Sequence, residues 1–356
     1  MPPAIDRRLC LSGLAALALG PLTGAARAQG AAPQGAPVQA APMQGAAGRS
    51  DTLLVMEKGD HALSFYELAS GRRTGRVELP GEYPHEFVVD RAGTRAYVAL
   101  YGAKSSTTPG PGGDAVYVVD LAARSLARTI DCGPFRRLHG IRLDARDRLM
   151  VLSEDRDVLL GIDAPERAER PDRAVATGGI KGHLFSLSRD GETAYVANIL
   201  SNTVSRVRPF APAEAPRIAA TGPWPEGNAL SPDEATLYVA HRRGATLAAL
   251  ATEAMTVTRS VPTRGDVVRV DCGPEGDLIL ANYAEKSLSL LDPALKEMAV
   301  VPLGAAPVAL ARHPSSPLAF AALEDDRIAV VDLEGRRVQG TLATGREPDV
   351  MVLLPG

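Results

Sequence analysis

The sequence predicts an all-β fold, a seven-bladed β-propeller of four-stranded blades in which the C-terminal strand closes the first blade. Three observations support this prediction. A unit of short strands recurs along the chain, a glycine marks the end of each unit, and one unit is divided between the two ends of the chain. Repetition of a short β unit is the sequence signature of ring-shaped and solenoid architectures.

The repeating unit is clearest at residues 182–207, GHLFSLSRDGETAYVANILSNTVSRV. HLFSLS, TAYVANI and TVSRV read as strands because they contain the β-branched and aromatic residues that suit a half-buried sheet. Asp190-Gly191 supplies a tight turn between the first two. The second strands of the six complete units read AYVAL, LMVLS, AYVAN, LYVAH, LILAN and LAFAA. A fourth, weaker strand ends each unit near a glycine: Gly133, Gly178, Gly222, Gly265, Gly304 and Gly345.

The seventh unit is split between the two ends. From Asp51 the chain starts directly at a second strand, DTLLVM, with no first strand before it. Residues 348–354, PDVMVLL, read as a first strand with nothing after it. Joining the two completes a blade, closes the ring and removes two exposed sheet edges. One domain is therefore predicted for residues 51–356.

AYVAN, LYVAH and SPDEATLYVA resemble the YVTN-type repeats of bacterial seven-bladed β-propellers, and the resemblance covers residues 51–356. It implies the fold. Propellers similar to these serve as lactonases, amine dehydrogenase subunits, metal chaperones and surface proteins, so the resemblance does not select one function.

The first 50 residues show two compositions. Residues 1–28 are predicted to be an export signal, with Arg7-Arg8 before a short apolar stretch and Ala26-Arg27-Ala28 as the cleavage pattern. The paired arginines resemble a twin-arginine signal; an uncleaved anchor is the alternative. Residues 29–50 contain mainly Ala, Gly, Gln and Pro and are predicted to be a flexible linker. The mature protein is therefore expected in the periplasm or outside the cell, with no membrane span after removal of the signal.

The net charge and the absence of certain motifs argue against several classes of function. The formal net charge is −3, and no basic stripe with interleaved aromatic residues appears, which argues against nucleic-acid binding. No nucleotide- or flavin-binding motif is present.

Cys132 and Cys272 remain after the signal, and the predicted strand directions place them on opposite faces of the ring. A disulfide needs Cα atoms within about 7 Å, so we expect none between them.

The strongest functional pattern lies at the start of the first strands, where all seven blades converge on the central channel. Three of the six histidines occupy this one repeat position, and carboxylates occupy most of the others. The aligned residues are His85, His139, His183, Glu226, Asp266, Val308 and Asp349. We also expect the insertion at residues 101–114, YGAKSSTTPGPGGD, on the same face, as a lid or as a plain surface loop.

Imidazoles and carboxylates around a narrow opening are ligands of first-row transition metals, and three nitrogens plus one oxygen suit zinc. His85, His139 and His183 belong to consecutive blades, and Glu226, Asp349 or Asp266 can complete the shell. A channel that is merely lined with polar groups is the alternative. Binding needs neutral imidazoles, so an ordinary histidine pKa predicts that affinity falls below about pH 6.5.

Three functions remain open. The favoured one is a binding protein for a divalent metal or a small molecule, similar to propeller-type periplasmic zinc chaperones. The second is a lactonase-like hydrolase, in which a metal or a His/carboxylate pair activates water. No nucleophile elbow is visible, and no catalytic residue can be assigned. The third is a scaffold that docks another exported protein.

Overall fold

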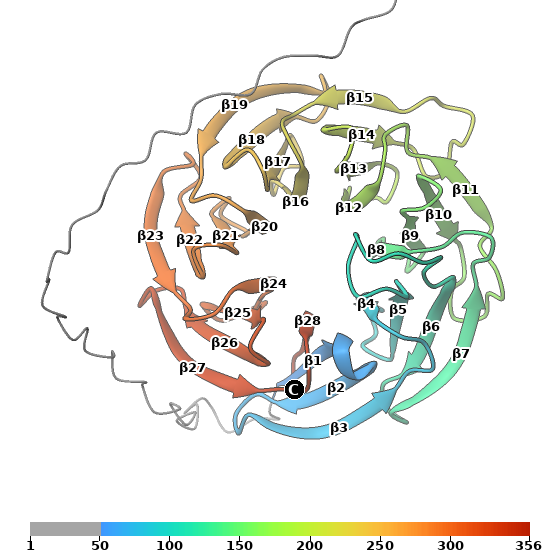
Figure 1. Ribbon diagram of the computed structural model, residues 1–356, viewed down its shortest axis with the longest axis horizontal. Coiled ribbons are helices and arrows are strands. Elements are labelled where there is room, and N and C mark those ends of the chain that lie inside the picture. The colour runs from blue at the N-terminus through green and yellow to red at the C-terminus, as the bar shows by residue number, and fades with distance from the viewer. Residues whose placement is uncertain (1–50) are drawn as a thin grey trace, which may run out of the picture. The chain divides into compact units, whose positions relative to one another are not determined.

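The computed structural model describes residues 51–356, and the predicted signal (1–28) and linker (29–50) lie outside this range. The described residues form seven four-stranded antiparallel sheets arranged as the blades of a ring, with one 3₁₀ turn, η1 (Lys58–Asp60), between two of the strands (Figure 1). The predicted seven-bladed β-propeller is confirmed. None of these residues forms a helix long and apolar enough to cross a bilayer.

Each blade contributes its first strand to the wall of the channel and its fourth strand to the rim of the ring (Figure 1). In order of blades 2 to 7 and then 1, the first strands are β4 (Pro84–Val89), β8 (Leu138–Leu143), β12 (Gly182–Leu187), β16 (Pro225–Leu230), β20 (Val267–Cys272), β24 (Pro307–Arg312) and β28 (Pro348–Leu354). The second strands are β5 (Arg95–Leu100), β9 (Leu149–Ser153), β13 (Ala194–Asn198), β17 (Thr236–His241), β21 (Leu278–Asn282), β25 (Leu318–Leu323) and β1 (Thr52–Glu57).

The third and fourth strands differ in burial. The third strands are β6 (Ala115–Asp120), β10 (Val158–Ile162), β14 (Thr203–Val207), β18 (Thr246–Ala251), β22 (Ser287–Leu291), β26 (Arg327–Asp332) and β2 (Ala62–Glu67), and they are largely buried on both faces. The fourth strands are exposed for most of their length: β7 (Ser125–Asp131), β11 (Arg173–Ala176), β15 (Arg217–Ala220), β19 (Thr256–Pro262), β23 (Glu297–Pro302), β27 (Arg337–Ala343) and β3 (Arg72–Glu78).

Blade 1 joins the two ends of the described chain, as predicted. Strand β28 pairs antiparallel with β1, and Leu53 lies opposite Leu353. The same blade packs against both neighbours, because Leu54 contributes to a core shared with Phe87 of blade 2, and Leu53 to one shared with Phe320 of blade 7. Closure therefore satisfies the backbone of two edge strands and completes two apolar interfaces.

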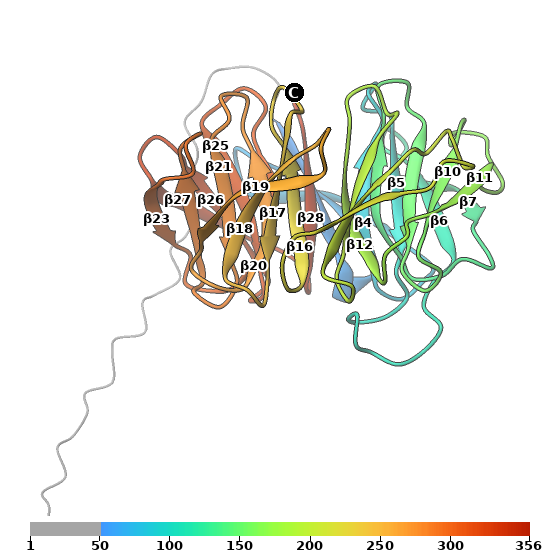
Figure 2. The same ribbon diagram turned by 90° about the horizontal axis from the view of Figure 1, so that it is seen from above.

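The strand directions place two sets of loops on one face. The first strands run away from this face and the second strands return to it, so the loops into each first strand and those after each second strand lie together. The insertion between β5 and β6 extends from the ring on one side (Figure 2). Cys132, after β7, and Cys272, at the end of β20, are on opposite faces as predicted, and both are free thiols.

Candidate functional site

A cavity of about 490 Å³ opens at the mouth of the channel on the face that carries the insertion. We call it the histidine mouth. Its lining includes five of the six predicted site residues: His85, His139, His183, Glu226 and Asp349. Each is the second residue of its first strand, in five different blades.

The sixth residue, Asp266, requires a correction. Strand β20 begins at Val267, so Val268 occupies the aligned position in blade 6 and lines the cavity. Asp266 precedes the strand and has a positive φ of 24°, as do the residues before five of the other six first strands, such as Lys181 at 61° and Trp224 at 60°. Its carboxylate accepts a hydrogen bond from Nε of Arg242 at 2.5 Å. It therefore supports the wall of the cavity instead of facing into it.

A break in strand pairing presents these side chains to the channel. Gly182 pairs with Asn198 and Leu184 with Ala197, so His183 is an extra residue with no partner on β13. The pairing of every other first strand also shifts register at or next to this position. A bulge leaves the extra residue out of the ladder and redirects its side chain. The repeated bulge thus builds a ring of side chains at the channel mouth.

The three imidazoles lie one beside the next. The ring centroids of His85 and His139 are 4.4 Å apart, and those of His139 and His183 are 3.9 Å apart in a stacked arrangement. The small size of Gly140 makes room for this approach. A Cβ atom there would lie 3.0 Å from the carbonyl oxygen of His183.

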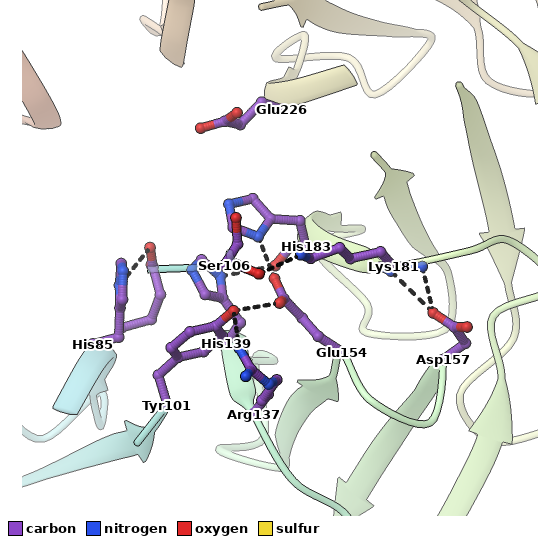
Figure 3. Close-up of polar contacts among 12 residues, drawn as sticks. His85, Tyr101, Ser106, Arg137, His139, Glu154, Asp157, Lys181, His183 and Glu226 are labelled. Atoms are coloured by element: carbon purple, nitrogen blue, oxygen red, sulfur yellow. Dashed lines mark hydrogen bonds and ion pairs between the residues drawn. The ribbon is translucent and has the colours of Figure 1, made fainter. Parts of the chain in front are cut away.

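Hydrogen bonds fix the orientation of two of the rings. Nδ1 of His139 donates to the carbonyl oxygen of His183 at 3.0 Å. Nδ1 of His183 contacts the carboxylate of Glu154, which also accepts a hydrogen bond from the hydroxyl of Tyr101 at 2.7 Å (Figure 3). In both histidines the proton therefore lies on Nδ1, and Nε2 carries the lone pair.

His85 has a different environment. Its Nδ1 lies 3.2 Å from Oδ2 of Asp349 without hydrogen-bond geometry, and this nitrogen and Oδ1 of Asp349 are both buried with no hydrogen-bond partner among the described residues. Lys58 lies 3.5 Å from Asp349, and Arg269 lies 3.8 Å from it. Buried polar atoms without partners are uncommon, and a bound ligand is one way to satisfy them.

Burial keeps the imidazoles neutral. Loss of solvation lowers the pKa of His85 and of His139 well below the ordinary value, and the positive charge that a neighbouring histidine would carry adds to the effect. Burial lowers the pKa of His183 to about 4, although the nearby Glu226 carboxylate opposes the shift. All three rings thus keep their lone pairs well below pH 6.5, which revises the expectation from an ordinary histidine.

Two carboxylates that the repeat alignment missed complete the site. Glu154 follows β9, and Glu86 follows His85 on β4; both are buried. The possible ligand atoms of His139, Glu154 and His183 all lie within 4.8 Å of one another, as do those of His85, Glu86 and His139. Glu86 also pairs with Arg269 at 3.0 Å. Burial raises the pKa of the Glu86 carboxyl group.

The insertion packs over the histidines. Lys181 donates to the carbonyl oxygen of Ser106 at 2.8 Å, and Nη2 of Arg137 donates to those of Thr108 at 2.7 Å and Gly110 at 2.8 Å. Lys104 pairs with Glu347 of blade 1 at 3.2 Å. Ser105 and Ser106 line the cavity. The loop therefore forms part of the wall of the cavity.

Comparisons with known proteins place the fold. No protein-family model and no curated protein matches the chain. A protein of unknown function from Desulfotomaculum acetoxidans is similar in structure, with a TM-score of 0.70 and 11% identity over 85% of this chain and 99% of that one. A periplasmic gluconolactonase from Pseudomonas aeruginosa has a TM-score of 0.68 and 16% identity over 86% of this chain and 99% of that one. Hydrazine synthase from Kuenenia stuttgartiensis has a TM-score of 0.67 and 17% identity over 79% of this chain and 92% of that one. The similarity establishes the propeller fold alone.

Proposed function

We propose that the histidine mouth binds a divalent transition-metal ion, with zinc the best match, in an exported metal-binding protein of the kind that a metallochaperone represents. One observation carries the proposal. His139 and His183 each direct Nδ1 to a protein acceptor, which leaves Nε2 unprotonated and without a partner among the described residues. Histidines that bind metals in proteins usually have this arrangement, because the second hydrogen bond fixes the tautomer and increases the basicity of the ligand.

The proposed ligands are Nε2 of His139, Nε2 of His183 and a nitrogen of His85, with Glu226, Asp349 or water as the fourth. An ion lies in the plane of each imidazole that binds it, whereas the rings of His139 and His183 are stacked. Binding one ion through both rings therefore requires His139 or His183 to turn from its position in this structure, against the hydrogen bond at its Nδ1. His85 can adjust to the ion as well, because its Nδ1 has no hydrogen bond to break among the described residues.

Cations around the cavity moderate the predicted affinity. Lys58, Lys104, Arg242 and Arg269 line it together with the carboxylates. Arg242 pairs with Glu226 at 3.2 Å, so Glu226 must release Arg242 in part to coordinate an ion. A doubly charged ion gains less from carboxylates that are already paired. We therefore propose a site that exchanges its ion, as transfer to a partner requires.

Zinc titration of the metal-free protein at pH 7.5 tests the proposal. We expect one ion per chain and at least about a hundredfold weaker binding in His139→Ala, because the central ligand is lost. His61→Asn is the matched control: His61 is a histidine on the same face outside the cavity lining, and asparagine tolerates its left-handed backbone at φ 53°. Equal affinity in all three proteins would contradict the proposal and favour a scaffold.

A lactonase-like hydrolase is the second candidate, because the Glu154–His183 pair orients an imidazole as a general base would require. In this reaction His183 takes a proton from water, whose oxygen attacks the lactone carbonyl, and the ring opens to a hydroxy acid. A pKa of about 4 makes His183 a weak base near neutral pH, which favours the metal proposal. Lactone opening by metal-free wild type that is lost in Glu154→Gln would reverse this preference.

A further inference from the structure

A second cavity lies at the opposite mouth of the channel, and we call it the arginine mouth. Its volume is about 710 Å³, and its lining comes from the far ends of the first strands and the turns that follow them, including Arg142, Ser186, Asn228 and Cys272. An ionic cluster around the buried Glu86 links the two linings, because Arg269 lines the histidine mouth and Arg142 lines the arginine mouth. In that cluster Glu86 pairs with Arg269, across the ring, at 3.0 Å and lies 3.9 Å from Arg142.

The charges that line the arginine mouth do not balance. The lining contains three arginines, Arg91, Arg142 and Arg189, and two aspartates, Asp144 and Asp271. Both aspartates are already neutralised by arginines outside the lining: Asp144 pairs with Arg148 at 2.5 Å, and Asp271 pairs with Arg312 at 2.7 Å. These aspartates therefore do not offset the three lining arginines. Asp147 and Glu234 contact only the backbone N–H groups of Arg91 and Arg189, and Glu86 lies 3.9 Å from Arg142.

The guanidinium groups of these arginines are incompletely used. Arg91 donates to the carbonyl oxygen of Ala145, and Arg189 to that of Pro232, and neither has an ion-pair partner among the described residues. Arg142 donates to the carbonyl oxygen of Ile141 at 2.7 Å, and its nearest carboxylate, Glu86, is beyond hydrogen-bond distance at 3.9 Å. Partial desolvation lowers the pKa of Arg142, yet 39% of its side chain stays exposed, so the guanidinium group is accessible to an anion.

We propose that the arginine mouth binds a small organic or inorganic polyanion that carries at least two carboxylate or phosphate groups. Planar guanidinium groups bind both kinds of oxyanion through paired hydrogen bonds. A concave surface of one sign of charge concentrates ligands of the opposite sign. Two or more anionic groups are needed because the three arginines lie on three different blades around the opening, blades 2, 3 and 4. This site is independent of the metal site.

Cys272 provides a built-in reporter for this cavity. Its thiol lies in the lining and is partly buried, whereas Cys132 is fully buried elsewhere. Burial and the adjacent Asp271 raise the pKa of Cys272 to about 11, so alkylation is slow at pH 8 and its rate can be followed. A ligand in the arginine mouth covers the thiol and adds negative charge beside it, and both effects slow the reaction.

The test uses the metal-free protein with citrate as the polycarboxylate and pyrophosphate as the polyphosphate, at ionic strength matched with sodium chloride. Calorimetry measures affinity, and mass spectrometry follows N-ethylmaleimide labelling of Cys272. We expect saturable binding of at least one anion, labelling slowed at least about fivefold, and about tenfold weaker binding in Arg142→Gln and in Arg189→Gln. The stronger anion identifies the group that the site prefers.

Arg146→Gln is the matched control, because Arg146 is exposed on the turn beside Arg142 and is outside the lining. It should bind like the wild type, and so should His139→Ala. If Arg142→Gln does not fold, Arg189→Gln alone decides. The proposal would be overturned if about 10 mM anion produced no binding heat in calorimetry and no protection of Cys272 from labelling. Equal loss in Arg146→Gln would also overturn it, by indicating general charge attraction.

Discussion

The two mouths of the channel are built from the same seven strands, yet they differ in chemistry. At the histidine mouth the ladder shifts register at the start of every first strand, and the second residue of each of these strands is a histidine, a glutamate, an aspartate or a valine. At the arginine mouth the pairing is regular up to the turns, and the lining carries three arginines beside two aspartates that are paired with other arginines. The fold therefore supplies two positions for a site. The pairing and the side chains at each end decide which ligand each can hold.

Charge separates the two mouths further. The imidazoles are neutral and act as lone-pair donors, whereas the arginines remain cationic and act as hydrogen-bond donors. The ionic cluster of Glu86, Arg269 and Arg142 links the two mouths, because Arg269 lines one cavity and Arg142 lines the other. A cation at one end and an anion at the other is the arrangement that this comparison predicts.

Deleting residues 348–356 should affect both mouths and give the largest effect. The deletion removes β28, exposes the edge of β1 and takes Met351 from the core shared with blade 7. We expect loss of a cooperative thermal transition, followed by aggregation. Circular dichroism melts of the full and shortened proteins measure this. An unchanged melting curve would contradict ring closure as a source of stability.

Acid should destabilise the histidine mouth selectively. The pKa of His183 is about 4 in the folded state and about 6.5 when unfolded, so the unfolded state binds the extra proton between these values. Stability is therefore complete above about pH 6.5 and falls as the pH decreases toward 4. At pH 5 the protonation of His183 in the unfolded state lowers the free energy of unfolding by about 2 kcal/mol.

Urea unfolding of the metal-free protein at pH 7.5 and at pH 5 measures this loss. The wild type should lose about 2 kcal/mol more than His183→Gln, which has no group to protonate at that position. Equal losses in the two proteins would show that burial of His183 does not shift its pKa. The lining of the arginine mouth contains no histidine, so it should contribute nothing in this range.

The sequence was sufficient for the fold, because a repeated unit and its split copy determine a ring and its closure. It also predicted that His85, His139 and His183 lie together, because all three occupy the same position of the repeat. Asp266 was misplaced by two residues because the residue before the strand and the bulged residue have no separate signature in the sequence. Glu154 was missed because it comes from the loop after a second strand. Its approach to His183 depends on how blades 3 and 4 pack, which a single blade does not show.

X-ray absorption at the zinc edge, on protein loaded with one equivalent of zinc, tests the central claim most directly. It reports the atoms around the ion, which affinity alone does not. We expect two or three imidazole nitrogens at about 2.0–2.1 Å and a spectrum that changes in His139→Ala. A shell of oxygen atoms alone, or a spectrum that is the same in His139→Ala, would contradict metal binding by the histidine mouth.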